Sequence, residues 1–72
     1  MKEVITMKNR HYGWLVAVFI YGYDGAAYEV FCETEHEAVK EKEEAYELNN
    51  EVECVTIDEV WYDPITGEYE AA

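Results

Sequence analysis

Carboxylates are the most abundant groups in this sequence that could take part in chemistry. The 72-residue chain holds 17 Asp and Glu residues against five Lys and Arg, which gives a formal net charge of −12 at pH 7. Two carboxylates act together as acid and base only where a cleft raises the pKa of one of them. A chain this short has little room for such a cleft, so we do not expect an enzyme.

The other candidate groups lack the partners that catalysis or metal binding needs. No serine occurs in the chain, which excludes Ser-His-Asp chemistry. His36-Glu37 has no second histidine at H-E-x-x-H spacing, and neither a Cys-x-x-Cys pair nor a calcium-binding loop is present. We expect Cys32 and Cys54 to be reduced, half-buried thiols. No catalytic residue, metal site or cofactor is predicted.

Residues 12 to 33 have the pattern of a β-hairpin. Aromatic and β-branched residues fill 12–21 and 28–32, and Asp24-Gly25 between them is a favoured two-residue turn. Such a turn pairs Ala17 with Cys32 and fixes which side chains share a face of the sheet. The apolar residues expected on one of the two faces are Trp14, Val16, Val18, Ile20 and Phe31.

Residues 34 to 48 are predicted to form the only helix. Thr34 followed by Glu37 is a capping box, and Asn49-Asn50 suits the helix end because Asn tolerates the left-handed conformation. The helix is expected to face the sheet with one arc and to expose acids on the opposite side. The arc consists of Ala38, Val39, Lys42, Ala45 and Tyr46. The acids are Glu37, Glu41, Glu44 and Glu47.

A second hairpin is expected over residues 51 to 71, around the turn Asp63-Pro64-Ile65-Thr66-Gly67. Its first strand is either continuous or interrupted at Asp58-Glu59, and its second is a short edge strand around Tyr69. Residues 3 to 7 could add a further strand. The prediction is therefore one α+β domain over residues 1–72, an antiparallel ββαββ sheet with one helix on one face.

Hydropathy and charge also limit the location and the partners. No apolar run approaches the roughly 20 residues that span a bilayer, and the first residues lack the apolar stretch of a signal peptide. We therefore expect a cytoplasmic protein. Neither nucleic acid nor an anionic membrane is an expected direct partner, because both are bound by clusters of Lys and Arg.

The charge is unevenly distributed along the chain. All five basic residues precede residue 43, and ten acids with no base follow from there to the last residue. Glutamates three or four positions apart on a helix stand about 5–6 Å from one another, which is close to the spacing of phosphates along a strand. One row of this kind would consist of Glu37, Glu41, Glu44 and Glu47. A second would consist of Glu53, Asp58, Glu59 and Asp63.

We interpret these rows as a surface that imitates nucleic acid and occupies the basic groove of a nucleic-acid-binding protein. The alternative is a solvated acidic face without a partner. In size, charge and element order, the chain resembles the small acidic phage-encoded inhibitors of bacterial defence, above all anti-CRISPR proteins that mimic DNA. The segments that carry the likeness are 34–44 and 51–59. The resemblance implies a target such as the DNA groove of a CRISPR effector in the bacterial host cytosol.

A second hypothesis is a protein–protein interaction module or a homodimer. One helix covers only one face of the sheet, so the first hairpin must leave an apolar face without cover. That face is either the set from Trp14 to Ile20 with Phe31, or the set Leu15, Ala17, Phe19, Tyr21 and Val30. Exposed apolar patches of this size mark interfaces, and a second copy of the chain is one expected occupant.

Overall fold

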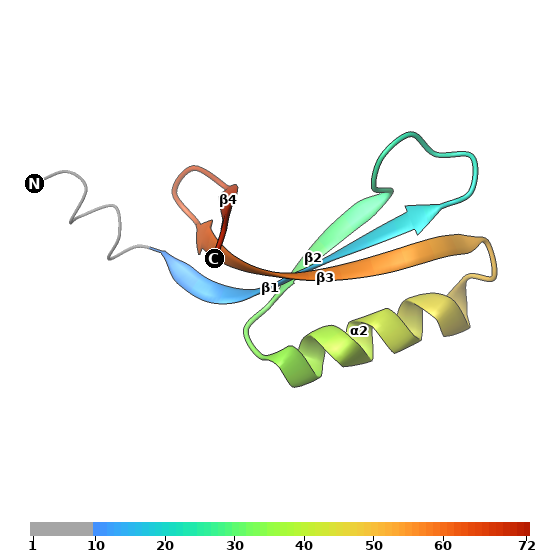
Figure 1. The fold of residues 1–72 in the computed structure, drawn as a ribbon, viewed down its shortest axis with the longest axis horizontal. Helices are drawn as coiled ribbons and strands as arrows, with labels where there is room; N and C mark the ends of the chain where they lie inside the picture. Colours follow the sequence, from blue (N-terminus) through green and yellow to red (C-terminus); the bar gives the residue numbers. More distant parts are fainter. Residues whose placement is uncertain (1–9) are drawn as a thin grey trace, which may run out of the picture.

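The computed structural model describes residues 10–72, and its elements follow the predicted order (Figure 1). The strands are β1 (His11–Ile20), β2 (Tyr28–Cys32), β3 (Val52–Asp63) and β4 (Glu68–Ala71), and the helix is α2 (Glu35–Leu48). For these residues the predicted α+β class, with an antiparallel sheet and a single helix, is confirmed. The further strand expected at residues 3 to 7 lies outside the described residues.

The four strands form one antiparallel sheet in the order β2-β1-β3-β4. β1 is central and pairs with β3 along its whole length. β3 is continuous, and its one register irregularity lies opposite Phe19 and Ile20 rather than at Asp58-Glu59. Figure 1 shows α2 lying along one face of this strongly twisted sheet. No helix of the described chain covers the opposite face.

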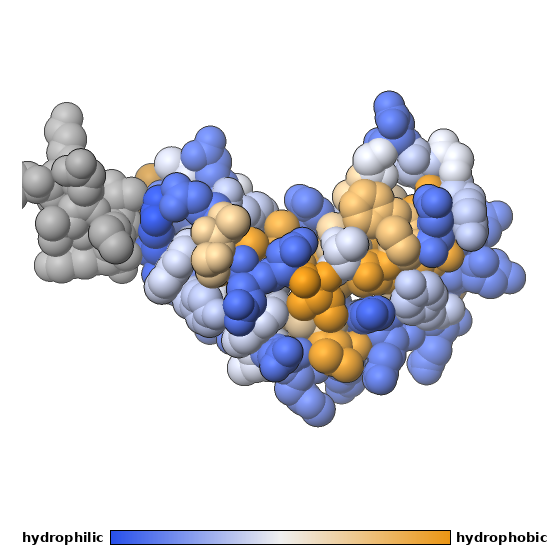
Figure 2. Space-filling view, viewed as in Figure 1, coloured by the Kyte–Doolittle hydropathy of each residue, from blue (hydrophilic) through white to orange (hydrophobic). Residues whose placement is uncertain are grey.

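The core lies between the sheet and α2 and is built from small apolar side chains. Val16 and Val18 of β1 are fully buried, and Ala38 and Ala45 are the buried residues of the helix. Because both helix residues are alanines, the valines of the sheet supply most of the core volume. Figure 2 shows apolar atoms reaching the surface in a band between sheet and helix, with hydrophilic residues around them.

The register predicted for the first hairpin is wrong. Ala17 pairs with Glu29 rather than with Cys32, and the connection covers residues 21–27 instead of two residues. β1 ends early because Gly22, at φ +88°, turns the chain, and the Tyr23 amide donates to the Ile20 carbonyl at 3.1 Å. Gly25, at φ +82°, makes a later turn in the same loop.

This register shift separates the residues that were predicted to share a face. Val16 pairs with Val30, and Trp14, Val16, Val18 and Ile20 all pack in or against the core under the helix. Phe31 pairs with Leu15, so it lies on the opposite face of the sheet. The grouping of Phe31 with the four even-numbered residues of β1 is therefore wrong, because an odd shift in register exchanges the two faces.

The predicted start and end of the helix are confirmed, but the conformation of its C-cap differs. The Thr34 hydroxyl accepts from the Glu37 amide at 3.2 Å, and the Glu37 carboxylate accepts from the Thr34 amide at 3.3 Å. Asn49 caps the C-terminus in an extended conformation, with φ −143° and ψ 110°, so the left-handed cap was a wrong prediction. Its side chain instead accepts from the Glu51 amide at 2.8 Å and leads the chain into β3.

The helix also presents a different face to the sheet from the one predicted. Ala38 is buried as expected, whereas Val39 and Tyr46 are 42% and 45% exposed. Glu41 and Glu44, expected on the outside, are half-buried. Small alanine side chains let a helix lie close to a sheet, so the alanines take the centre of the contact and larger side chains stay at its margin.

The second hairpin forms as predicted. Asp63 pairs with Glu68 across a four-residue turn, and Gly67 adopts φ +76° there. The Gly67 amide donates to the Asp63 carbonyl at 2.7 Å, and the Asp63 carboxylate accepts from the Ile65 amide at 2.9 Å. β4 is the short edge strand that the sequence indicated.

Candidate protein-binding surface

Three of the four predicted helix acids lie together beside an edge of the sheet. Glu37, Glu41 and Glu44, here called the acidic flank, line one wall of a cleft of about 620 Å³ between α2 and β2. Residues 30–33 form the facing wall, and His11, Tyr62 and Pro64 also line the cleft. Glu47 is exposed and does not line the cleft.

The structure does not assemble the four acids of the second hairpin into one row. Asp58 and Glu59 are neighbours on β3 and therefore point to opposite faces of the sheet. The Glu59 carboxylate accepts a hydrogen bond from the Tyr12 hydroxyl at 2.8 Å. The Asp63 carboxylate is used inside the turn, and Glu53 is exposed near the other end of the strand.

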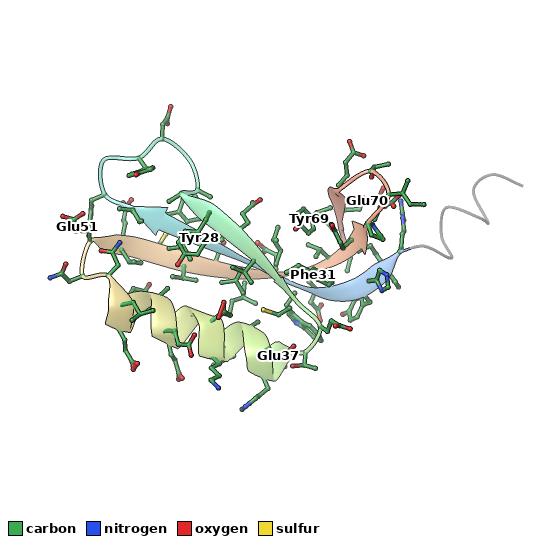
Figure 3. All side chains as sticks on the ribbon, turned by 180° about the vertical axis from the view of Figure 1, so that it is seen from behind. Tyr28, Phe31, Glu37, Glu51, Tyr69 and Glu70 are labelled. Atoms are coloured by element: carbon green, nitrogen blue, oxygen red, sulfur yellow. The ribbon has the colours of Figure 1, made fainter. Side chains whose placement is uncertain are left out.

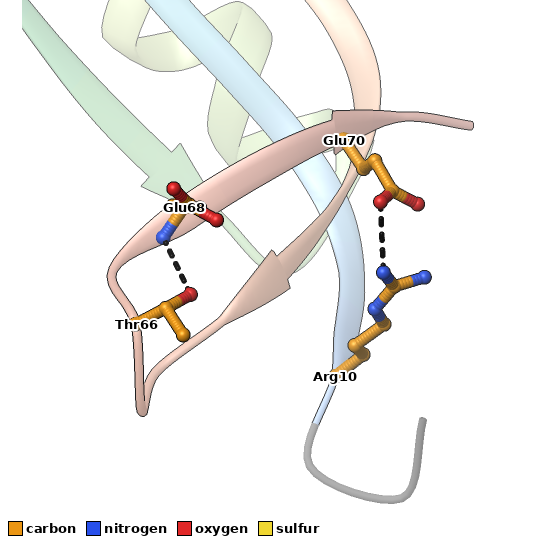
Figure 4. A network of polar contacts seen from close by, with 4 residues as sticks. All are labelled: Arg10, Thr66, Glu68 and Glu70. Atoms are coloured by element: carbon orange, nitrogen blue, oxygen red, sulfur yellow. Dashed lines mark hydrogen bonds and ion pairs between the residues drawn. The ribbon is translucent and has the colours of Figure 1, made fainter. Parts of the chain in front are cut away.

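Few carboxylates of residues 10–72 form an ion pair with a base in the same part of the chain. Residues 10–72 contain sixteen Asp and Glu residues against three Lys and Arg. Among them the only ion pair joins Arg10 to Glu70 at 2.8 Å, next to the turn in which the Thr66 hydroxyl accepts from the Glu68 amide (Figure 4). No charged residue of this part is buried. The acidic flank therefore keeps its charge available for a partner.

Cys32 lies in the same cleft, and these carboxylates affect the pKa of its thiol. Its side chain is buried, with 6% exposed. Burial raises the pKa of the Cys32 thiol, and the nearby carboxylates of Glu41 and Glu37 raise this pKa further. A raised pKa keeps the thiol protonated at neutral pH, so Cys32 is not an activated nucleophile.

The sheet face opposite α2 carries an aromatic cluster. The Phe31 and Tyr62 rings lie 5.1 Å apart and the Tyr62 and Tyr69 rings 5.0 Å apart, which connects β2 with the second hairpin. Figure 3 labels Phe31 on β2 and Tyr69 on β4. Tyr62 and Tyr69 were not among the predicted site residues, and they pair with each other across the second hairpin. The rings partly cover this face themselves.

The part of the chain that the structure describes offers no metal-binding or membrane-spanning feature. It holds no group of three or more His, Cys, Asp or Glu placed to bind a metal ion. Its helix has neither the length nor the apolarity needed to cross a bilayer. Comparison of the chain with family models, curated proteins and solved structures finds no match. The function must therefore be inferred from the surface itself.

Proposed function

We propose that this protein is a non-enzymatic inhibitor that binds the basic, nucleic-acid-binding surface of another protein through the acidic side of α2. The observation that carries the proposal is the acidic flank, where Glu37, Glu41 and Glu44 line one cleft wall. Lys40 lines the same cleft, and no ion pair between it and a described carboxylate is formed. Glutamates three or four positions apart on a helix have Cβ atoms about 5–6 Å apart, a spacing that suits a groove that normally holds phosphates.

The partner class follows from the sign and the excess of the charge. A net charge of −12 repels nucleic acid and attracts a basic groove, so it favours rapid association at low salt. A CRISPR effector is the first target to test, because the size, charge and element order of the chain resemble those of acidic phage-encoded inhibitors. The acids of the second hairpin are left out of the proposed surface, since they point in different directions.

The test is competition with DNA for the candidate effector, followed by the anisotropy of a labelled duplex across a salt series. The helix variant carries Glu41→Lys, Glu44→Lys and Glu47→Lys. The control variant carries three reversals at exposed positions away from α2, at Asp24, Asp58 and Glu68. At about 1 kcal/mol for each exposed charge contact, the helix variant should compete about 100-fold less well. The control variant should lose much less of its ability to compete with DNA, although its net charge changes by the same amount.

Two outcomes would contradict the proposal. Equal competition by the helix variant and the control would mean that the position of the acids is unimportant. Direct binding to the effector that does not weaken with salt would mean that charge does not drive binding. In either case the acidic side of α2 is a solvated surface.

A protein–protein interaction module or homodimer is the second candidate function. It is favoured by the aromatic cluster on the sheet face that α2 leaves uncovered, in which Tyr69 remains 37% exposed. Light scattering at micromolar concentration distinguishes a monomer from a dimer. A dimer that Tyr69→Lys dissociates would support this candidate, and a monomer at all concentrations would contradict the homodimer.

A further inference from the structure

β2 is the edge of the sheet that borders the acidic cleft. Among the described elements only β1 pairs with it, so one side of β2 has no neighbouring strand. The cleft is lined by the last three residues of β2, Val30, Phe31 and Cys32, and by Glu33 directly after the strand. Successive residues of a strand point to opposite faces, so a cleft that reaches three in a row lies at the strand edge. Figure 3 shows β2 in front, with α2 running below it and Glu37 near the start of the helix.

The other edge of the sheet is protected in a way that β2 is not. β4 has four residues, all exposed, and two of them are glutamates. Charged residues and short length are devices that prevent an edge strand from pairing with another chain. β2 contains one acid, Glu29, and its last three residues are apolar and half-buried or buried. Another strand can therefore pair more easily with β2 than with β4.

The walls of the cleft indicate the chemistry of the added strand. They carry carboxylates from Glu33 and from the acidic flank, against the single ammonium group of Lys40. Val30 and Phe31 supply apolar surface at the strand edge. An occupant with basic side chains toward α2 and apolar side chains between them would complement both features.

We propose that β2 pairs with an extended basic segment of the partner protein, which becomes a fifth strand of the sheet. Main-chain hydrogen bonds to the open edge would supply affinity, and Lys or Arg side chains facing the acidic flank would supply specificity. This inference rests on the proposed function and names a part of the basic partner that is recognised: an extended segment at its nucleic-acid-binding surface.

Charge also argues against a second copy of this chain as the occupant. Two β2 strands paired antiparallel about a two-fold axis would place both helices on the same face of the joined sheet. The acidic flank of one copy would then lie toward the acidic flank of the other, and like charges across an interface are unfavourable. The same carboxylates would attract a basic segment.

The probe for the test is an eight-residue peptide of alternating lysine and valine, acetylated and amidated at its ends. Titration into the isotope-labelled full chain should shift the amide resonances of residues 28–33 and of the acidic flank, and should slow amide exchange in β2. Resonances of β4 should stay in place. Two further peptides, N-methylated at every lysine or at every valine, each block one edge of the probe. At least one of them should bind tenfold or more weakly.

A matched pair of variants distinguishes the effect of the cleft carboxylates from the effect of net charge. Glu41→Gln with Glu44→Gln removes two carboxylates from the cleft and conserves side-chain size. Glu35→Gln with Glu43→Gln removes two exposed carboxylates of the same helix that do not line the cleft. The first pair should weaken peptide binding about tenfold at low salt, and the second less than threefold. Circular dichroism confirms that both variants keep the helix.

The inference is overturned if the peptide does not bind, if neither methylated peptide binds more weakly, or if both variant pairs lose binding equally. These failures differ from a failure of the proposed function. DNA competition without peptide binding at β2 retains the acidic inhibitor and removes the added strand. Peptide binding at β2 without DNA competition retains the added strand and removes the acidic inhibitor.

Discussion

At the scale of single residues, Gly13 leaves the space that the Phe31 ring of the aromatic cluster occupies. A Cβ atom here would meet the Cys32 carbonyl oxygen and would lie 2.5 Å from Cζ of Phe31. We expect Gly13→Ala to lower the free energy of unfolding by about 2–3 kcal/mol, because overpacking forces the ring or the backbone to move. Urea denaturation measures the change.

The control for this substitution is Gly25→Ala. Gly25 has φ +82° and no atom within 4 Å of its ideal Cβ, so this variant changes backbone strain alone. We expect this substitution to lower the free energy of unfolding by about 1 kcal/mol. A cost for Gly13→Ala no larger than that of the control would show that the Phe31 ring can move aside freely.

Cys32 provides a chemical measure of the electrostatics of the cleft. Its pKa is raised by burial and by the neighbouring carboxylates, whereas Cys54 is exposed. Because a raised pKa lowers the thiolate fraction at any pH below it, a thiol reagent at pH 8 should label Cys54 first. In a Cys54→Ala background, Glu41→Gln should lower the pKa of Cys32 and accelerate its labelling, and Glu43→Gln should not. Mass spectrometry follows the labelling, and equal rates in both variants would contradict the assigned cause.

At the scale of elements, the cap at Thr34 is the most local determinant of α2. Thr34→Ala removes the acceptor for the Glu37 amide, and should cost about 1 kcal/mol of stability. Thr34→Ser keeps the hydroxyl and should restore most of this loss. Urea denaturation followed by circular dichroism tests both variants. If serine fails to rescue stability, the hydroxyl bond is not the source of the effect.

The two ends of α2 should respond oppositely to the same change of charge. The helix has acids in its first turn and no base in its last turn. Glu47→Lys places a cation at the negative end of the helix dipole and should stabilise by about 0.5 kcal/mol. Glu35→Lys changes the net charge equally but places the cation at the positive end, so it should destabilise. Thermal unfolding of both variants measures this difference, and shifts in the same direction would show that net charge dominates.

The elements that could be predicted are those specified by neighbouring residues. The spacing of Thr34 and Glu37 defines the helix start, and Asp63 and Gly67 define the second turn. The first hairpin contains two competing turn glycines, and the structure uses Gly22 to end β1. There the Tyr21 amide donates to the Glu51 carbonyl at 3.0 Å. This partner is distant in the sequence, so a local pattern cannot reveal it.

The candidate site could be predicted only in part, for a related reason. Helical spacing alone places Glu37, Glu41 and Glu44 on one side of α2. Whether that side faces away from the sheet or borders β2 depends on which face of the helix packs against the sheet. The buried alanines define the packed face, but only in the presence of the sheet. The edge position of β2 likewise follows from the strand order, which the sequence pattern does not specify.

At the scale of the whole molecule, the parts that carry the fold and the parts that carry charge are separate. The buried core of the described chain contains no polar or charged residue, and the acids lie on its outside. Charge can therefore be altered at many positions without removing core contacts. This separation makes the charge-reversal experiments interpretable as tests of binding.

The same separation predicts that salt stabilises the isolated protein. A net charge of −12, with one ion pair among residues 10–72, makes the folded chain repel itself. The Debye length is about 30 Å at 0.01 M salt, longer than α2 at about 21 Å, and falls to about 8 Å at 0.15 M. Raising sodium chloride between these values should therefore increase the melting temperature. A gain of about 1 kcal/mol corresponds to roughly 4–8 °C in a domain of this size.

The control is the variant with Glu43→Gln and Glu47→Gln, whose melting temperature should depend less on salt because it carries less charge. A melting temperature that stays constant or falls with salt would show that self-repulsion does not limit stability. The predicted response is opposite to that of binding, because salt screens the attraction between the acidic flank and a basic partner. If the melting temperature rises with salt as predicted, weaker competition at higher salt does not result from unfolding.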